Sequence, residues 1–215
     1  MSQPSKIKIF LADDHTMFRD GVKQVLSETA GLSVVEEAST AAEVLEKAQK
    51  VECDVVVLDI AMPGRSGIEV LKQLKQMKPR LNILILSMYP EDQYASRAIK
   101  AGASGYLTKN KASVELIEAI RRVASGRKYI SPEVAEQLAI DLEQDIDRPL
   151  HQKLADREYQ VMCLLASGKT VKQISDELSI SASSVSTMRA RILNKLRMKT
   201  TVELAYYAIK HGLVN

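Results

Sequence analysis

Tryptophan is absent from this 215-residue chain, and aromatic residues make up only 4% of it. Aliphatic side chains must therefore fill any core, and hydrophobic residues, at 46%, are numerous enough to do so. No apolar run approaches the ~18 residues that a membrane-spanning helix needs. The longest apolar stretches, 55–58 and 83–86, have the length of buried strands. Residues 1–10 lack the apolar segment of a signal peptide. We therefore expect a cytoplasmic protein without a membrane partner.

Cysteine is also scarce. Cys53 and Cys163 are the only two, and each lies far from the other in apolar surroundings. This usage indicates reduced side chains that serve packing, and it argues against a disulfide or a cysteine-based metal site.

The net charge is only +3, but it is unevenly distributed along the chain. Residues 153–215 hold ten Lys or Arg and five acidic residues, whereas residues 1–152 hold 20 basic and 22 acidic residues. The basic C-terminal part is typical of a segment that binds a polyanion. Solvation of an ordinary surface would give the same balance, so charge alone does not decide the partner.

The N-terminal part alternates short β-branched runs with amphipathic segments. The predicted strands are 7–12, 33–38, 55–59, 82–87 and 105–107. The predicted helices are 16–27, 40–50, 67–78, 91–101 and 114–125. Strict alternation of five strands and five helices predicts an α/β domain at residues 1–125, with a doubly wound, five-stranded parallel sheet.

The pattern changes after residue 125. Ser131 followed by Pro132 is typical of a helix start, so we predict a linker at 126–151 that contains a helix. Its far end is polar, with Asp145 and Asp147 before Pro149. A small all-α domain is then predicted at 152–215, with helices at 156–167, 171–178, 182–196 and 201–211. Its predicted N-terminal caps are the capping boxes Thr170–Gln173 and Thr200–Glu203 and the N-cap Ser181.

Polar side chains follow four of the predicted strands at their carboxyl ends, where parallel sheets bind ligands. They are Asp13, Asp14, Asp59, Ser87 and Lys109. Clustered carboxylates repel one another unless a cation neutralises them, and hard oxygen ligands suit Mg²⁺. A carboxylate beside Mg²⁺ can attack a phosphoryl group, whose oxygens the hydroxyl and the ammonium could then hold. This edge is therefore the candidate site of covalent phosphorylation.

The predicted helices 171–178 and 182–196 are joined by a short turn, as in a helix-turn-helix. The second helix has an apolar stripe and a polar face, and five basic residues but no acid lie between Ser186 and Lys199. Small hydroxyl side chains near its start allow close approach to a major groove, and the cations can reach bases or phosphates. The candidate DNA contacts are Ser183, Ser186, Thr187, Arg189, Arg191 and Lys195.

Residues 5–125 resemble a response-regulator receiver domain through the segments 11–15 (LADDH), 57–67 (VLDIAMPGRSG), 86–87 (LS) and 105–109 (GYLTK). The resemblance implies that Asp59 is the phosphoacceptor and that Asp13, Asp14, Asp59 and the backbone carbonyl of Ala61 hold Mg²⁺. It also implies that Lys109 contacts the phosphoryl group, that Ser87 and Tyr106 form the switch, and that Pro63 and Gly64 shape the loop after Asp59. We interpret His15 as a surface neighbour without a chemical role.

Residues 152–213 resemble the LuxR-type helix-turn-helix through the segments 154–158, 164–170, 174–178, 184–187, 193–196 and 202–204. With a receiver domain before it, the whole chain is similar to NarL/FixJ-family response regulators. The resemblance implies a regulator rather than an enzyme, with a sensor histidine kinase and promoter double-stranded DNA as partners. We expect a homodimer on DNA, because one short recognition helix reads few base pairs.

Three residues depart from the LuxR-type pattern. Ala155 stands where a Thr or Ser cap is usual, and Ser186 and Met188 replace a commonly basic residue and a commonly His or Tyr residue. An operator sequence carried over from relatives would therefore be unsafe.

Two other functions remain open from the residues alone. A phosphatase of the haloacid-dehalogenase type also uses a strand-end Asp with Mg²⁺, but its usual second Asp is replaced by Ala61. The helical domain could also bind protein or RNA, which the salt dependence of duplex binding would distinguish. A dinucleotide-binding protein is disfavoured, because no Gly-x-Gly-x-x-Gly follows the first strand.

Overall fold

The computed structural model describes residues 6–62, 65–143 and 149–214. The chain divides into two compact units, Met1–Val134 and Ala135–Asn215. The sequence-based predictions for Pro63 and Gly64, and for the acidic residues Asp145 and Asp147, lie outside the described residues. Both cysteines are free thiols; Cys163 is buried and Cys53 is partly buried. No helix of the described chain combines the length and hydropathy needed to cross a membrane.

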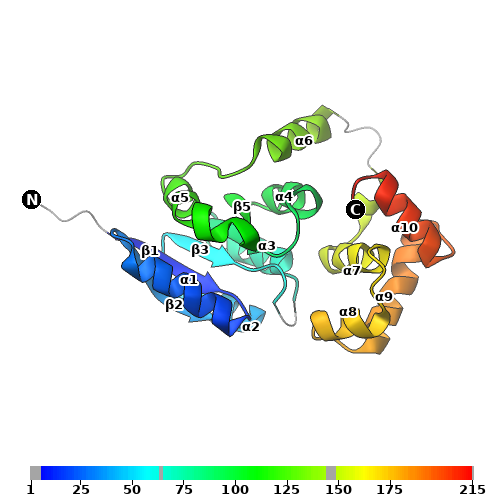
Figure 1. The fold of residues 1–215 in the computed structure, drawn as a ribbon, viewed down its shortest axis with the longest axis horizontal. Coiled ribbons are helices and arrows are strands. Elements are labelled where there is room, and N and C mark those ends of the chain that lie inside the picture. The colour runs from blue at the N-terminus through cyan, green and yellow to red at the C-terminus, as the bar shows by residue number, and fades with distance from the viewer. Residues whose placement is uncertain (1–5, 63–64, 144–148, 215) are drawn as a thin grey trace, which may run out of the picture. The chain divides into compact units, whose positions relative to one another are not determined.

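The first unit contains a five-stranded sheet in the order β2-β1-β3-β4-β5 (Figure 1). All neighbouring strands are parallel. The strands are β1 (Ile7–Ala12), β2 (Leu32–Ala38), β3 (Val55–Leu58), β4 (Asn82–Ser87) and β5 (Gly105–Thr108). The predicted α/β fold class is confirmed, and the predicted strand ends differ from the observed ones by at most one residue.

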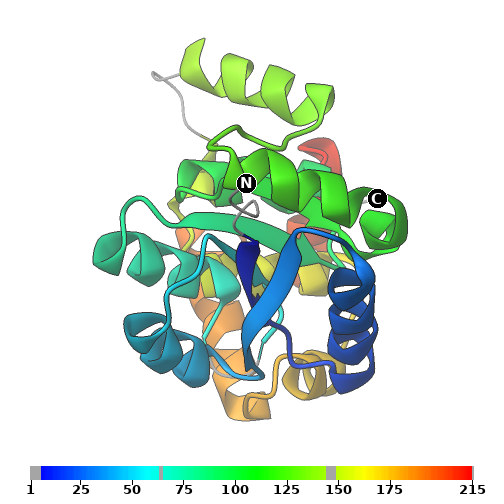
Figure 2. The same cartoon turned by 90° about the vertical axis from the view of Figure 1, so that its left-hand side faces the viewer.

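Helices cover both faces of this sheet. They are α1 (Thr16–Glu28), α2 (Ala41–Lys50), α3 (Gly67–Met77), α4 (Glu91–Lys100) and α5 (Ala112–Ala124). Alternate residues of the central strands, such as Ile9 and Val57, pack in one cluster with α1 and α5. The residues between them, such as Phe10 and Val56, are equally buried and face the opposite layer. Figure 2 shows α1 on one side of the sheet and α2 and α3 on the other.

The strand order reverses between β1 and β3, which is where an open parallel sheet forms its ligand crevice. The N–H of Asp59 donates to the carbonyl of Ala12 at 2.9 Å, and the N–H of Asp13 donates to the carbonyl of Ala38 at 3.1 Å. These bonds fix the two acidic residues at the ends of adjacent strands.

The predicted linker helix is α6 (Pro132–Glu143). The hydroxyl of Ser131 accepts a hydrogen bond from the N–H of Val134 at 3.3 Å, so Ser131 caps the helix and Pro132 is its first residue. This is the arrangement that the Ser-Pro pair predicted, since proline at the first helical position leaves no N–H without a partner.

The second unit consists of short helices that follow the turn η2 (Leu150–Lys153). They are α7 (Asp156–Ala166), α8 (Val171–Glu177), α9 (Ala182–Lys195) and α10 (Thr201–Lys210). The predicted capping box at Thr170 is present, with reciprocal bonds of 2.8 and 3.2 Å to Gln173. At Thr200 only half of the predicted box forms, because the carboxylate of Glu203 accepts from the N–H of Lys199 instead.

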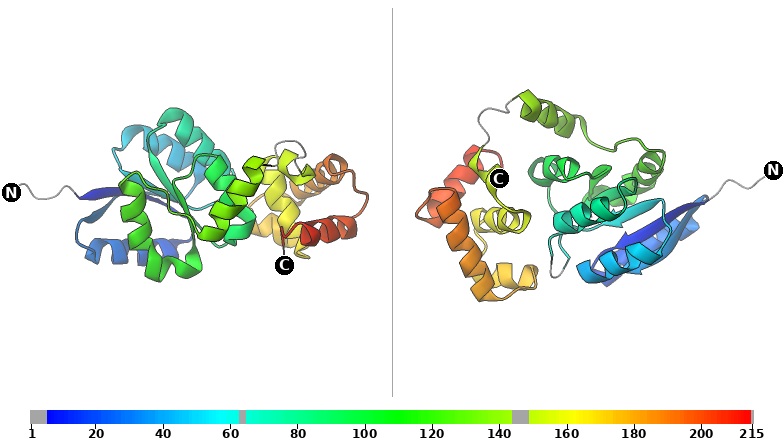
Figure 3. Two further views of the ribbon diagram at one scale, coloured as in Figure 1. Left: turned by 90° about the horizontal axis from the view of Figure 1, so that it is seen from above. Right: turned by 180° about the vertical axis from the view of Figure 1, so that it is seen from behind.

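The turn between α8 and α9 is compact and can be followed in the right-hand view of Figure 3. Ser179 adopts a left-handed backbone with φ +50°, which is uncommon outside glycine. The hydroxyl of Ser175 donates to the carbonyl of Ile180 at 2.6 Å, and Ser181 caps α9 by accepting from the N–H of Ser184. These bonds hold α8 and α9 in the predicted helix-turn-helix.

Candidate functional site

A single ammonium group joins two buried carboxylates at the carboxyl edge of the sheet. The Nζ atom of Lys109 lies 2.6 Å from Oδ2 of Asp59 and 2.7 Å from Oδ2 of Asp13. All three side chains are almost completely buried, with exposed fractions of 4% or less. Since Lys109 begins a 3₁₀ turn directly after β5, the sheet delivers the three groups from three different strands.

The electrostatics of this cluster show a shortage of positive charge. Burial raises the pKa of the Asp59 carboxyl; the ammonium of Lys109 offsets this shift only in part, and the nearby Asp13 adds to it. Burial alone would lower the pKa of Lys109, but the carboxylates of Asp59 and Asp13 outweigh burial and raise it. The ammonium therefore remains charged while the carboxylates still repel one another.

The backbone around Asp59 is held in place by the start of α3. A Cβ atom on Gly67 would lie 2.4 Å from the carbonyl oxygen of Asp59 and 2.5 Å from Cα of Ile60, so only glycine permits this approach. The N–H of Ala61 donates to Oδ1 of Asp59 at 3.0 Å. Because Oδ1 binds this N–H and Oδ2 binds Lys109, the orientation of the carboxylate is fixed before any ligand arrives.

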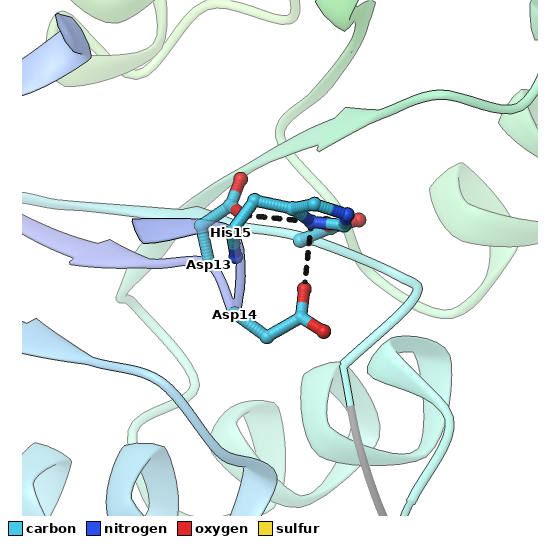
Figure 4. Close-up of side chains that lie close together, drawn as sticks. Asp13, Asp14 and His15 are labelled. Atoms are coloured by element: carbon cyan, nitrogen blue, oxygen red, sulfur yellow. Dashed lines mark hydrogen bonds and ion pairs between the residues drawn. The ribbon is translucent and has the colours of Figure 1, made fainter. Parts of the chain in front are cut away.

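Asp14 and His15 form the more open side of the pocket (Figure 4). The Nδ1 atom of His15 lies 2.9 Å from Oδ1 of Asp14 and 3.4 Å from Oδ1 of Asp13, and the backbone N–H of His15 donates to Asp13 at 2.8 Å. Asp13, Asp14, His15 and Asp59 each offer a ligand atom within 4.8 Å of the others. His15 therefore contacts the acids directly, although 61% of its side chain is exposed.

Two residues of α1 support the pocket, and the sequence reasoning missed both. The Nζ atom of Lys109 lies 4.7 Å from the ring centroid of Phe18, a distance suited to a cation–π interaction. The guanidinium of Arg19 donates to the backbone carbonyl of Asp13 at 2.6 Å. Only the packing of α1 against the strand ends brings these side chains to the site, so no local motif signals them.

The switch residues predicted by resemblance form a separate chain of contacts. The hydroxyl of Ser87 accepts from the N–H of Tyr89 at 3.1 Å, and the hydroxyl of Tyr106 donates to the carbonyl of Tyr89 at 2.9 Å. Ser87 and Tyr106 are fully buried, and burial strongly raises the pKa of Tyr106. In the described structure the hydroxyl of Ser87 makes no hydrogen bond to Asp59. The structure thus places Ser87 at the predicted strand end, bonded to the loop that follows it.

The predicted DNA-reading residues all lie on the exposed surface of α9. They are Ser183, Ser186, Thr187, Arg189, Arg191 and Lys195. Val185 and Ile192 are buried on the opposite side of the helix, as the apolar stripe predicted. One face of α9 therefore packs on its own unit, and the other presents hydroxyl and basic groups to solvent.

The three cations on this face are not equivalent. The Nε atom of Arg189 donates to the hydroxyl of Thr201 at 2.9 Å, and Nζ of Lys195 lies 2.6 Å from Oε2 of Glu158. Arg191 has neither a hydrogen bond nor an ion pair with any part of the chain that the structure describes. Glu158 also accepts the N–H of Ala155, which compensates for the missing Thr or Ser cap.

Comparison with known proteins supports both units. The family model for the response regulator receiver domain matches residues 9–121. The model for bacterial regulatory proteins of the luxR family matches residues 152–208. Each match covers one of the two regions in which the geometry places candidate functional residues.

Relatives of known identity match over almost the whole chain. The response regulator GacA of Pseudomonas aeruginosa is 37% identical over 97% of this chain and 98% of its own length. The response regulator UvrY of Escherichia coli is 34% identical over 97% of this chain and 96% of its own. A solved LuxR-family two-component response regulator from Aurantimonas sp. is 35% identical with a TM-score of 0.59, over 65% of this chain and 100% of that one. The chain therefore belongs to the NarL/FixJ family of response regulators, the DNA-binding regulators of two-component systems, with a receiver domain followed by a LuxR-type helix-turn-helix.

Proposed function

We propose that Asp59 is the phosphoacceptor of this regulator and that its phosphorylation changes the affinity of the chain for promoter DNA. The observation that carries the proposal is the fixed carboxylate of Asp59, which is buried, oriented by the N–H of Ala61 and contacted by Lys109 at 2.6 Å. A carboxylate held in this way is ready to act as a nucleophile, because its oxygens do not need to be reoriented.

The residues present fit a hard divalent cation. Three carboxylates face one buried ammonium, and the Oδ1 atom of Asp14 is contacted by Nδ1 of His15, a side chain that is 61% exposed. We assign Mg²⁺ to Asp13, Asp14, Asp59 and the backbone carbonyl of Ala61, with water and phosphoryl oxygens as further ligands. When bound, the ion would supply positive charge opposite the phosphoryl oxygens.

The chemistry asked of the chain is simple. A carboxylate oxygen of Asp59 forms a bond to phosphorus, while the bond between phosphorus and the donor breaks and its electron pair leaves with the donor. The donor is a phosphohistidine of a sensor kinase or a small acyl phosphate. Lys109 then transfers its contact from the Asp59 carboxylate to a phosphoryl oxygen. Ser87 supplies a hydroxyl donor from the adjacent strand end.

Stoichiometric phosphorylation is favoured over phosphatase turnover. The haloacid-dehalogenase mechanism needs an acid two residues after the nucleophile, where this chain has Ala61, whose backbone N–H binds Asp59. Without that second carboxyl group, no dedicated side chain at this position can protonate the leaving group or activate the water that would hydrolyse the aspartyl phosphate. We therefore propose a regulator rather than an enzyme.

Labelling with a small acyl phosphate and Mg²⁺ tests the assignment, followed by mass spectrometry to locate the phosphoryl group. The wild type should gain one phosphoryl group at Asp59, and Asp59→Asn should gain none there. Asp54→Asn is a matched control, because Asp54 is an exposed acid at the other end of β3 whose carboxylate accepts from the N–H of Lys8. Equal labelling of Asp59→Asn, with the group mapped elsewhere, would contradict the proposal.

The DNA contacts are assigned to the solvent-facing residues of α9 named above. We propose a receiver domain at 1–125, a linker at 126–151 and a DNA-binding domain at 152–215. The compact units meet within α6, at Val134 and Ala135, which lies inside the proposed linker. The proposed partners are a sensor histidine kinase and double-stranded promoter DNA, in the cytoplasm.

A second copy of the chain is the proposed partner on DNA. Val202, Tyr206 and Ile209 of α10 have exposed fractions of 78%, 73% and 59%, and their spacing places them on one side of the helix. An exposed apolar stripe of this kind favours association, and a dimer would double the number of base pairs read. Sedimentation of wild type and Tyr206→Asp with operator DNA tests the dimer.

A further inference from the structure

The edge strand β5 has an additional neighbour beyond the sheet. Residues 128–130, which follow α5, run beside β5, with a parallel bridge between Gly105 and Tyr129. The N–H of Tyr129 donates to the carbonyl of Ser104 at 3.0 Å, and the N–H of Tyr106 donates to the carbonyl of Tyr129 at 3.1 Å. The first residues of the linker therefore occupy the position of a sixth strand.

Gly105 makes this approach possible. A Cβ atom at position 105 would lie 2.7 Å from the carbonyl oxygen of Tyr129 and 2.9 Å from its Cβ atom, distances shorter than real Cβ contacts. Any side chain here would push the linker away from β5. Glycine is needed at position 105 because it lets the backbone of Tyr129 approach β5 closely. It is not needed for an unusual backbone conformation, since its φ is not in the left-handed region.

Side chains of α5 hold the same segment. The hydroxyl of Tyr129 donates to Oε2 of Glu115 at 2.6 Å, and Nε of Arg122 donates to the carbonyl of Lys128 at 2.9 Å. The ring of Tyr129 packs against the core cluster shared by the sheet, α1 and α5. Burial, together with the carboxylate of Glu115, raises the pKa of Tyr129, so its hydroxyl remains a donor. Tyr129 is therefore fixed through both its backbone and its side chain.

Tyr106 is bonded to two regions at once. Its hydroxyl binds the carbonyl of Tyr89, whose N–H binds Ser87 at the edge of the phosphorylation pocket. Its backbone N–H binds Tyr129, and α6 begins three residues later at Pro132. Three residues span at most about 11 Å, so the start of α6 cannot move independently of Tyr129. A change at Tyr106 thus has a direct bonded route to the linker helix.

We propose that Tyr129 is a positioning residue that transmits the state of Tyr106 to the linker helix, and that its bonds to β5 and Glu115 form the connection. The proposal rests on the proposed function, because it concerns how phosphorylation of Asp59 reaches the DNA-binding domain. Tyr129 lies outside the phosphorylation pocket and outside the DNA-reading surface of α9. Substitution of Tyr129 should therefore weaken the effect of phosphorylation on DNA affinity, without preventing phosphorylation or DNA binding.

Two side-chain substitutions break the connection by different means, a third controls for them, and a fourth acts on the backbone. Tyr129→Phe removes the hydroxyl and keeps the ring, and Glu115→Ala removes its acceptor. Glu118→Ala makes the same change three residues further along α5, at an exposed side chain that acts on Tyr129 through its charge but makes no hydrogen bond or ion pair in the described structure. Gly105→Ala acts on the backbone bridge, where amide hydrogen exchange of Tyr129 should become faster.

The measured quantity is the ratio of operator affinities of the full-length protein with and without an acyl phosphate and Mg²⁺, alongside labelling at Asp59. We expect labelling to stay at the wild-type level in Tyr129→Phe and Glu115→Ala, while the affinity ratio falls toward one from the wild-type value of about fivefold or more. Glu118→Ala should keep the wild-type ratio. A wild-type ratio in both connection variants would overturn this proposal alone. If phosphorylation did not change the operator affinity of the wild type, the proposed function would be overturned, and this proposal would fall with it.

Discussion

The phosphorylation pocket and the recognition helix differ in how their polar groups are held. In the pocket, Asp13, Asp59 and Lys109 are buried, and each is fixed by bonds of 2.6–3.0 Å. On α9 every candidate contact residue is exposed, and Arg191 makes no hydrogen bond or ion pair in the described chain. Covalent chemistry needs groups that are oriented in advance, whereas a surface that binds DNA can be ordered by the phosphates and bases themselves. We therefore propose that the chain contains one preformed site and one that DNA orders on binding.

The largest effect is expected from removing the buried cation. Lys109→Met leaves the carboxylates of Asp13 and Asp59 uncompensated, and we expect the unfolding free energy of the first unit to fall by about 3–5 kcal/mol. Saturating Mg²⁺ should restore part of the loss, because it replaces the missing positive charge. Urea denaturation with and without Mg²⁺ measures both effects.

Lys111→Met is the matched control for that experiment. Lys111 lies two residues further along, is half exposed, and pairs with Glu91 at 3.3 Å, so its loss should have little effect. If the two variants were equally stable in the absence of Mg²⁺, Lys109 would not be the cation that compensates the buried carboxylates of a preformed pocket.

A smaller effect is expected from the cations of α9. Arg191→Ala should weaken operator binding by about 1–3 kcal/mol if the side chain reads a guanine edge. If Arg191 meets a phosphate instead, affinity should fall equally on all sequences and the salt slope should flatten by about one unit. Arg189→Ala also breaks the bond to Thr201, so it tests a cation that is partly engaged.

Titrations of both variants on operator and random duplexes at several salt concentrations separate these outcomes. Unchanged affinity of Arg189→Ala and Arg191→Ala on every duplex would show that α9 is not the reading helix.

Loss of one metal ligand should have a comparable or smaller effect. Asp14→Ala removes the most exposed carboxylate of the pocket, and we expect Mg²⁺ affinity to fall by about tenfold or more, with slower phosphorylation at limiting Mg²⁺. Asp20→Ala, an exposed acid on α1, should leave both unchanged. Calorimetric titration of Mg²⁺ is the measurement, and an unaltered affinity would remove Asp14 from the site.

The smallest effect is expected from Glu158, whose carboxylate forms an ion pair with Lys195 of α9. Burial would raise its pKa, but the hydrogen bonds from Lys195 and Ala155 outweigh burial and hold the pKa below its ordinary value of 4.5. A depressed carboxyl pKa means that the stabilisation is fully present above pH 4.5 and is lost as the pH falls through the lower, folded-state value. Glu158→Gln should cost about 1 kcal/mol of unfolding free energy at pH 7 and reduce the pH dependence below 4.5.

Thermal unfolding from pH 3 to 7 measures this contribution, and an unchanged pH profile in Glu158→Gln would contradict it. The same variant releases Lys195, so any gain in DNA affinity would show that the ion pair competes with phosphate contact.

The sequence predicted the features that depend on local order along the chain. Strand ends can be read from apolar runs, so the positions of Asp13, Asp59 and Lys109 at one edge followed from the parallel sheet. The cap at Thr170 also followed from a four-residue pattern, and it is present as predicted.

Contacts between distant elements could not be read in the same way. Phe18 and Arg19 reach the pocket only because α1 packs beside the strand ends. Lys195 pairs with a residue 37 positions away, and Tyr129 returns to β5 after the whole of α5. Such contacts depend on three-dimensional packing rather than on spacing.

The central claim is that phosphorylation of Asp59 controls DNA binding, and one titration tests it most directly. Operator affinity is measured for wild type and Asp59→Asn, each with and without an acyl phosphate and Mg²⁺. We predict that the phosphodonor changes the affinity of the wild type by about fivefold or more and leaves that of Asp59→Asn unchanged. An equal response of both proteins, or no response in the wild type after confirmed labelling, would contradict the account.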